Sequence, residues 1–241
     1  MTKELTTKRS YEFLSSNAIK IIALITMTID HMGMILFPSQ YWMRYIGRLA
    51  YPMFAYMIGE GAVYTKNRLR YFLRLLIPGI GMGVVYYIFE KELLFNIFLT
   101  FSVSVALCTV WDTVVKLAAK KNFVPSLLCL VSAFYILWFI AYGIRRLFHV
   151  PIFYDGGLFG MLMPVAVYAA KGKWQKLIAL AVMCVIISID LRSIHGEFLC
   201  ILSVIVIFFY NGSRGKLPLK SLFYVYYPAH IAVLYLLSYL M

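Results

Sequence analysis

Residues 17–37 read NAIKIIALITMTIDHMGMILF, an apolar run in which Asp30 and His31 stand side by side. A helix of this length rises about 30 Å at 1.5 Å per residue, which matches the hydrocarbon core of a bilayer. An ionisable side chain inside such a helix is costly and marks a candidate functional site. The run therefore predicts a transmembrane helix that carries an acid and an imidazole.

Eight further apolar runs follow along the chain of 241 residues. Hydrophobic residues make up 63% of the chain and charged residues 14%, where a soluble domain has about a quarter charged. We therefore predict an all-α integral membrane protein, a polytopic bundle of about nine transmembrane helices. The predicted spans are residues 17–37, 45–64, 69–89, 93–115, 123–143, 153–170, 174–189, 198–210 and 222–240.

The segments between the runs are too short to hold a soluble domain. Residues 1–241 are expected to form a single transmembrane domain, in which residues 1–16 are a cytoplasmic tail. The cysteines Cys108, Cys129, Cys184 and Cys200 lie inside apolar runs without a CxxC or Cys/His spacing. They are predicted to be packing residues, and no metal site is expected.

The net charge of +13 would suggest nucleic acid binding in a soluble protein. Here 17 of the 23 Lys and Arg residues fall in the N-terminal tail or in alternate loops. The positive-inside rule then places the N-terminus in the cytoplasm and, after nine spans, the C-terminus outside. We expect a multi-pass protein of the inner or plasma membrane, with membrane lipid and no nucleic acid as partner.

Asp30 and His31 allow two interpretations. They are either a polar pair that fixes helix packing, or a general base with a carboxylate neighbour that tunes it. We favour the second interpretation, because a neutral packing residue would cost less. Arg44 is expected to extend to the membrane interface, whereas the deeper Arg48 is at a level where its guanidinium can pair with Asp30. A structural ion pair and a catalytic role for Arg48 are both open.

Glu60 lies between Gly59 and Gly61, which permit close approach of another helix. It is expected to pair with a basic residue of the next loop. His230 follows Pro228 in the last span, where a kink can turn it toward a polar interior or leave it as a packing residue. The remaining histidines, His149 and His195, are expected in outer loops without a chemical role.

The loop after the second span is denser in positive charge than topology requires. It is either a contact with anionic lipid or a binding site for a phosphorylated cytoplasmic ligand. Its basic residues are Lys66, Arg68, Arg70 and Arg74.

Several segments in order resemble the TraX family. They are residues 19–33 (IKIIALITMTIDHMG), 45–55 (YIGRLAYPMFA), 60–61, 65–68, 210–215 (YNGSRG) and 222–230 (LFYVYYPAH). The family is named for a protein that acetylates the N-terminus of conjugative pilin. It is also distantly similar to type-three membrane acyltransferases and to the lysosomal heparan glucosaminide acetyltransferase. In the type-three enzymes ten residues separate a basic residue from a histidine in the first span; Lys20 and His31 have this spacing here, with Lys in place of the usual Arg.

The resemblance implies an acyltransferase that moves an acetyl group from cytoplasmic acetyl-CoA to an amine or hydroxyl. The acceptor would be a peptide N-terminus, a sugar or a lipid at the outer face. His31 would act as general base, Asp30 would support the imidazolium, and Arg48 or His230 would stabilise the oxyanion. The phosphates of the donor would bind to residues Lys20, Lys66, Arg68, Arg70 and Arg74.

Two alternatives stay open. Asp30, His31 and Arg48 would form a proton relay in a proton-coupled transporter. The inverted repeats and paired broken helices that many transporters show are not visible in the sequence. A non-catalytic assembly factor of a secretion or pilus system would not need His31.

Overall fold

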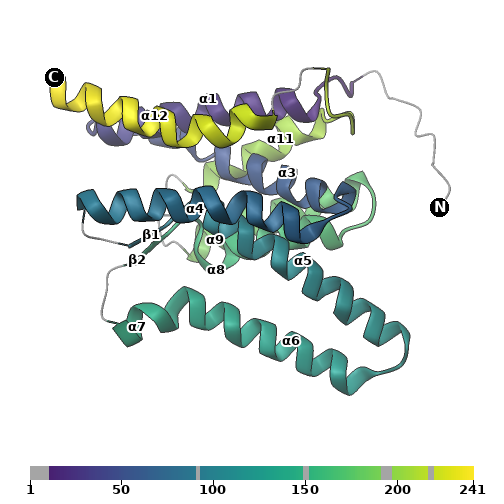
Figure 1. Cartoon of the computed structure of the whole chain (residues 1–241). Coiled ribbons are helices and arrows are strands. Elements are labelled where there is room, and N and C mark those ends of the chain that lie inside the picture. The colour runs from purple at the N-terminus through teal and green to yellow at the C-terminus, as the bar shows by residue number, and fades with distance from the viewer. Residues whose placement is uncertain (1–10, 91–92, 149–151, 191–196, 217–219) are drawn as a thin grey trace. The chain divides into compact units, whose positions relative to one another are not determined.

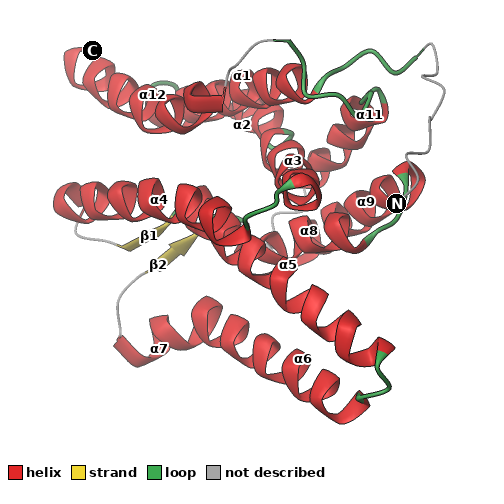
Figure 2. Ribbon diagram, turned by 45° about the vertical axis from the view of Figure 1, so that its right-hand side comes forward, coloured by secondary structure: helices red, strands yellow, loops and turns green. Residues whose placement is uncertain are grey.

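Helices make up most of the chain (Figures 1 and 2). The computed structural model describes residues 11–90, 93–148, 152–190, 197–216 and 220–241. The chain divides into two units. Unit 1 comprises Met1–Phe54 and Phe198–Met241, and unit 2 comprises Ala55–Glu197. The boundary falls within helix α3 (Ala50–Tyr64), and the single domain stays a prediction.

Unit 1 brings the two ends of the chain together. Helix α1 (Ser16–Ile35) packs against the short helix α2 (Tyr41–Gly47) and against α12 (Lys220–Leu240), beside which it lies in both views (Figures 1 and 2). The 3₁₀ turn η2 (Phe198–Leu202) leads into α11 (Ser203–Phe208). Residues separated by nearly the whole sequence are therefore neighbours in unit 1.

The YNGSRG segment holds the start of α1. Leu14 forms a parallel β-bridge with Tyr210, and the backbone N–H of Ser16 donates to the carbonyl of Ser213 at 2.8 Å. Asn211 closes the local turn, because its side-chain oxygen accepts from the N–H of Ser213 at 2.9 Å. Ser15 then caps α1 through the N–H of Ala18. Residues 11–16, predicted to be part of a tail, are thus attached to unit 1; residues 1–10 lie outside the described residues.

The second predicted span is not one helix. Helix α2 ends at Gly47, residues 48–49 form a turn, and α3 begins at Ala50. Pro52 explains the break, because proline has no N–H to donate to the carbonyl of Arg48 but is tolerated in the first turn of a new helix. Arg48 therefore lies at a helix break and not along a continuous helix.

Two glycines allow α1 and α2 to pack closely. A Cβ atom on Gly33 would lie 2.7 Å from the Cβ of Met43, and one on Gly47 would overlap the carboxylate of Asp30. Small residues at helix contacts are typical of membrane proteins, where close backbone approach contributes much of the association energy. The contact fixes the Asp30 side chain against α2.

Unit 2 is a second set of helices, in which α5 has the most helix neighbours. Helix α5 contacts α4, α6 and α8, and α8 contacts α9. Its elements are α4 (Arg68–Glu90), β1 (Leu93–Phe95), α5 (Ile97–Ala119), α6 (Phe123–Trp138), a π-helical turn η1 (Phe139–Gly143), α7 (Ile144–Phe148), β2 (Ile152–Tyr154), α8 (Gly157–Ala169) and α9 (Lys173–Asp190).

Asn96 organises the start of α5. Strand β1, which pairs in parallel with β2, ends just before Asn96, and Asn96 is fully buried. Its side-chain oxygen caps α5 through the N–H of Phe98 at 3.1 Å, while its amide donates to the carbonyl of Gly79 at 2.8 Å. Gly79 leaves space for this contact, because an added Cβ would lie 2.9 Å from Leu99. These bonds join α4 to α5.

Each predicted span contains at least one helix, but the helices differ in length. Among the described residues, four helices are long and apolar enough to cross a membrane: Ser16–Ile35, Arg68–Ile88, Ile97–Ala119 and Leu222–Leu240. Many large apolar side chains point outward; on α6, for example, Val124 is 70% and Leu128 63% exposed. Exposed apolar faces on helices of this length are those of a membrane protein.

We predict that Gly47→Ala destabilises the protein by about 1–3 kcal/mol, because the new methyl group displaces the Asp30 carboxylate and separates α1 from α2. The matched control is Gly81→Ala in α4, where an added Cβ has no neighbour within 4 Å. The control should be neutral or stabilising by up to about 1 kcal/mol. Thermal unfolding of the purified variants measures both, and equal midpoints would contradict the close packing at Gly47.

Candidate functional site

Two histidines meet between α1 and α12 in unit 1. His31 Nδ1 lies 2.7 Å from His230 Nε2, a short hydrogen bond between residues 199 positions apart in the chain. The rings are tilted by 32°, with centroids 4.9 Å apart. His230 is 7% exposed, whereas His31 is only half-buried. Both are sequence-predicted site residues, and their direct contact was not predicted.

The partners of His230 determine which nitrogens carry protons. His230 Nδ1 lies 2.9 Å from the backbone carbonyl of Tyr226. A carbonyl can only accept, so Nδ1 is protonated and, in the neutral ring, Nε2 is the acceptor. His31 Nδ1 must then donate to it, which leaves the lone pair on His31 Nε2. The hydrogen-bond chain thus presents an unprotonated nitrogen on the more exposed ring.

Tyr226 supports this arrangement in two further ways. Its ring stacks on His230 with centroids 5.2 Å apart and an angle of 13°. Its hydroxyl lies 2.8 Å from Thr28 Oγ1, which itself donates to the carbonyl of Leu24 at 2.8 Å. Because the single hydroxyl proton of Thr28 is used there, the Tyr226 hydroxyl is the donor to Thr28. This bond ties α12 to α1 one turn away from the histidines.

Asp30 pairs with Arg44. Arg44 Nη1 lies 2.7 Å from Asp30 Oδ2 and 3.3 Å from the Asp30 backbone oxygen, and the Arg44 and Asp30 side chains are 28% and 16% exposed. This pair was not predicted, and the extension of Arg44 to the interface stays a prediction. The short helix α2 turns Arg44 toward α1, and Gly47 leaves room for the carboxylate. The pairing of Arg48 with Asp30 and its catalytic role stay predictions.

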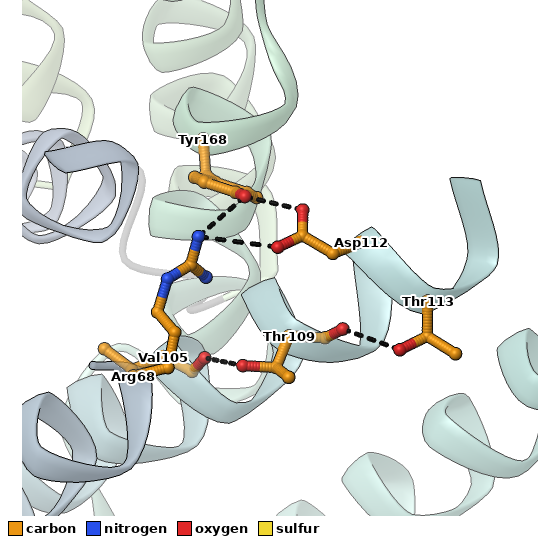
Figure 3. Close-up of polar contacts among 6 residues, drawn as sticks. All are labelled: Arg68, Val105, Thr109, Asp112, Thr113 and Tyr168. Atoms are coloured by element: carbon orange, nitrogen blue, oxygen red, sulfur yellow. Dashed lines mark hydrogen bonds and ion pairs between the residues drawn. The ribbon is translucent and has the colours of Figure 1, made fainter. Parts of the chain in front are cut away.

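Unit 2 holds a separate polar cluster around one residue of the basic loop (Figure 3). Arg68 Nη2 donates to the hydroxyl of Tyr168 at 2.7 Å and lies 3.5 Å from Asp112 Oδ2. Tyr168 in turn donates to Asp112 Oδ1 at 2.5 Å. Three helices, α4, α5 and α8, each contribute one member. The Arg68–Asp112–Tyr168 cluster was not foreseen, although Asp112 lies within a predicted span and its cost there was a usable signal.

The other predicted donor-binding residues are not gathered in this way. Lys66, Arg70 and Arg74 are exposed, and Asn67 between them caps α4 through the N–H of Arg70 at 2.8 Å. Lys20 belongs to unit 1, where its ammonium lies 5.4 Å from the ring centroid of Phe223. Their role in binding a donor stays a prediction.

Glu60 forms its ion pair with Lys176 of α9. The expectation that Glu60 pairs with a basic residue of the next loop is therefore wrong for this ion pair. The flanking glycines do allow close packing, as predicted: Gly59 lies against the backbone oxygen of Pro164, and Gly61 against the hydroxyl of Tyr71. The packing of α3 onto α8 and α4 carries Glu60 away from its own loop.

Comparison with known proteins identifies the family of this chain. The family model described as "TraX protein" matches residues 15–238. The chain belongs to the TraX family. The match includes both histidines of unit 1 and the Arg68–Asp112–Tyr168 cluster of unit 2.

Two curated proteins are similar to parts of this TraX-family chain. An uncharacterised protein of Rickettsia prowazekii is 31% identical over 128 residues, which cover 52% of this chain and 46% of that protein. A probable fimbrial assembly protein FimC, serogroup H1, of Dichelobacter nodosus is 32% identical over 76 residues, covering 30% of this chain and 31% of that protein. The chain thus covers less than half the length of either relative. No solved structure matches.

We predict that Asp30→Asn and Arg44→Gln are non-additive, with a coupling free energy of about 1–2 kcal/mol, because each charge loses its partner in the other's absence. Lys20→Gln is the control with Asp30→Asn. It lies ten residues away on α1, about 15 Å, and should be additive. Unfolding free energies of the single and double variants give both couplings. Additivity of Asp30→Asn with Arg44→Gln would contradict the ion pair.

Proposed function

We propose that this TraX-family protein is a membrane-embedded acyltransferase in which His31 is the general base. The supporting observation is the hydrogen-bond chain from the Tyr226 carbonyl through His230 to His31, which leaves an unprotonated nitrogen on a half-buried ring. A positioned imidazole is the commonest general base in enzymes and contributes about 10²–10⁴-fold to rate. The acetyl donor and acetyl-CoA follow from the family resemblance.

In the proposed reaction, His31 Nε2 removes a proton from an amine or hydroxyl as that atom bonds to the acyl carbon of a thioester. When the carbon–sulfur bond breaks, His31 returns the proton to the leaving thiolate. Between these steps the His31 imidazolium keeps its Nδ1–H bond to His230 Nε2. Both ring nitrogens of His230 are then engaged, so His230 orients His31, and Arg48 is left as the candidate that stabilises the oxyanion.

The acceptor is proposed to be a peptide N-terminus, a sugar or a lipid outside the cytoplasm. Similarity to a probable fimbrial assembly protein favours a surface-fibre subunit among these. The same similarity supports a second candidate function, that of an assembly factor without catalysis. The two functions differ in whether His31 is needed.

We predict that His31→Ala lowers acetyl transfer at least about 100-fold while membrane insertion is retained, because the base is lost. His230→Phe should also reduce transfer, since His31 Nδ1 loses its acceptor, and His230→Gln should recover part of it through the amide oxygen. His149→Ala, at a histidine outside the described residues, is the control. Labelled acetyl incorporation by membranes that contain equal amounts of each variant is the measurement.

Wild-type transfer by a well-inserted His31→Ala variant would rule out the general base. If that variant also supports fibre assembly in cells, the assembly-factor function becomes the better explanation. If His31→Ala loses both acetyl transfer and membrane insertion, the transfer by His230→Gln is used instead, because this variant keeps a polar side chain at the buried position.

We further propose nine spans in an inner or plasma membrane, with the N-terminus in the cytoplasm. The four long apolar helices supply four spans, and the shorter helices that coincide with the other predicted runs supply the rest. The distribution of basic residues supports this orientation, because 17 of 23 fall on one side.

Reporter fusions test this topology. A reporter active only in the cytoplasm should work when inserted after Lys66 or Lys171, and one active only outside should work after Met241. The expected pattern follows from an odd number of spans. A cytoplasmic C-terminus would show that one predicted run does not cross the membrane.

A further inference from the structure

The two terminal nitrogens of the Arg68 guanidinium differ in their hydrogen bonding. Its Nη2 donates to Tyr168 and lies against Asp112, and its central carbon lies 4.7 Å from the Tyr168 ring centroid (Figure 3). Its Nη1 is buried and has no hydrogen-bond partner in the described part of the chain. A buried donor on a permanently charged group is destabilising when unpaired. The unpartnered Nη1 therefore lacks an acceptor oxygen among the described residues, and a ligand could supply one.

Asp112 and Tyr168 hold the guanidinium in one orientation. Because both contacts are to Nη2, rotation of the guanidinium would break them, and Nη1 is kept at a fixed position. The Tyr168 hydroxyl also donates to Asp112, so each member of the cluster has its partner on a different helix. Such support of a binding residue by neighbours that do not touch the ligand is typical of preorganised sites.

The surrounding charge indicates an anionic oxygen. The exposed cations Lys66 and Arg70 flank Arg68 in sequence, and Lys116 lies one turn beyond Asp112 on α5 and is also exposed. The carboxylate of Asp112 is already engaged by Arg68 and Tyr168. Arginine with neighbouring lysine is the usual combination for phosphate esters, whose several oxygens can be shared.

We infer that Arg68 Nη1 is the specific anchor for a phosphate oxygen of a cytoplasmic ligand, and that Asp112 and Tyr168 are its positioning residues. The identification of this ligand as an acyl-CoA rests on the proposed function. Lys66 and Arg70 contribute charge without fixed geometry. The site is confined to unit 2.

Binding of coenzyme A to the purified full chain in nanodiscs tests this site, with pantetheine, which lacks the phosphates, as the comparison ligand. Arg68→Lys keeps the charge but loses the planar fork, and should weaken coenzyme A binding about 10–100-fold. Tyr168→Phe should weaken it about 3–10-fold, because the guanidinium loses one of its two restraints. Arg146→Lys, at an exposed arginine of unit 2, is the matched control and should bind as the wild type does.

Equal coenzyme A affinity of Arg68→Lys and the wild type would overturn the inference, as would a wild type that binds pantetheine as well as coenzyme A or binds neither. If Arg68→Lys does not fold, Tyr168→Phe decides, and wild-type affinity in that variant overturns the positioning role. His31→Ala removes the proposed base but no member of the Arg68–Asp112–Tyr168 cluster, so this variant separates the phosphate site from the proposed function. If coenzyme A binding depends on Arg68 but the wild type transfers no acetyl group, the phosphate site stands and the acyltransferase proposal fails. If the wild type transfers acetyl groups but Arg68→Lys binds coenzyme A with unchanged affinity, the acyltransferase proposal stands and the phosphate site fails.

Discussion

The hydrogen bond between His31 and His230 joins the first and last helices of the chain, and the arrangement of unit 1 depends on it. In an apolar environment, a polar side chain that leaves its partner finds no water in exchange, so such a bond is costly to break. The Tyr226–Thr28 bond restrains the same pair of helices one turn away, and the backbone bonds of the YNGSRG segment restrain the start of α1. Two side-chain hydrogen bonds and this set of backbone bonds thus hold α1 in place.

The sequence predicts the helices and the residues that need partners better than it predicts the partners. Asp30, His31, Glu60 and His230 stand out because ionisable groups are expensive in apolar runs, and this signal does not depend on tertiary structure. The pairing of each acid with its cation, in contrast, depends entirely on tertiary structure. The packing of the short helix α2 on α1 places Arg44 beside Asp30, and the packing of α3 brings Glu60 to Lys176, a partner 116 residues away. Neither consequence is visible in the spacing of charges along the chain.

Each of the two candidate sites contains an arginine paired with an aspartate. In unit 2, Arg68 carries a permanent charge, which Asp112 partly neutralises within hydrogen-bonding range. In unit 1, Asp30 is neutralised by Arg44, so the adjacent His31 does not receive a free carboxylate as its partner. The expected support of a His31 imidazolium by Asp30 is weakened by the same ion pair. The remaining orienting group is the neutral ring of His230.

A neutral partner would suit the general base proposed for His31 in an apolar environment. A carboxylate behind the imidazole would stabilise the protonated ring, but it would also place an ion in the membrane during the resting state. A histidine pair carries no charge until a proton arrives. In the proposed reaction, His31 takes a proton from a neutral acceptor while negative charge develops on the thioester oxygen, so the reacting groups would stay neutral as a whole. The attraction between the imidazolium and that oxyanion would then replace the missing carboxylate, and it would act only in the transition state, where it accelerates the proposed reaction.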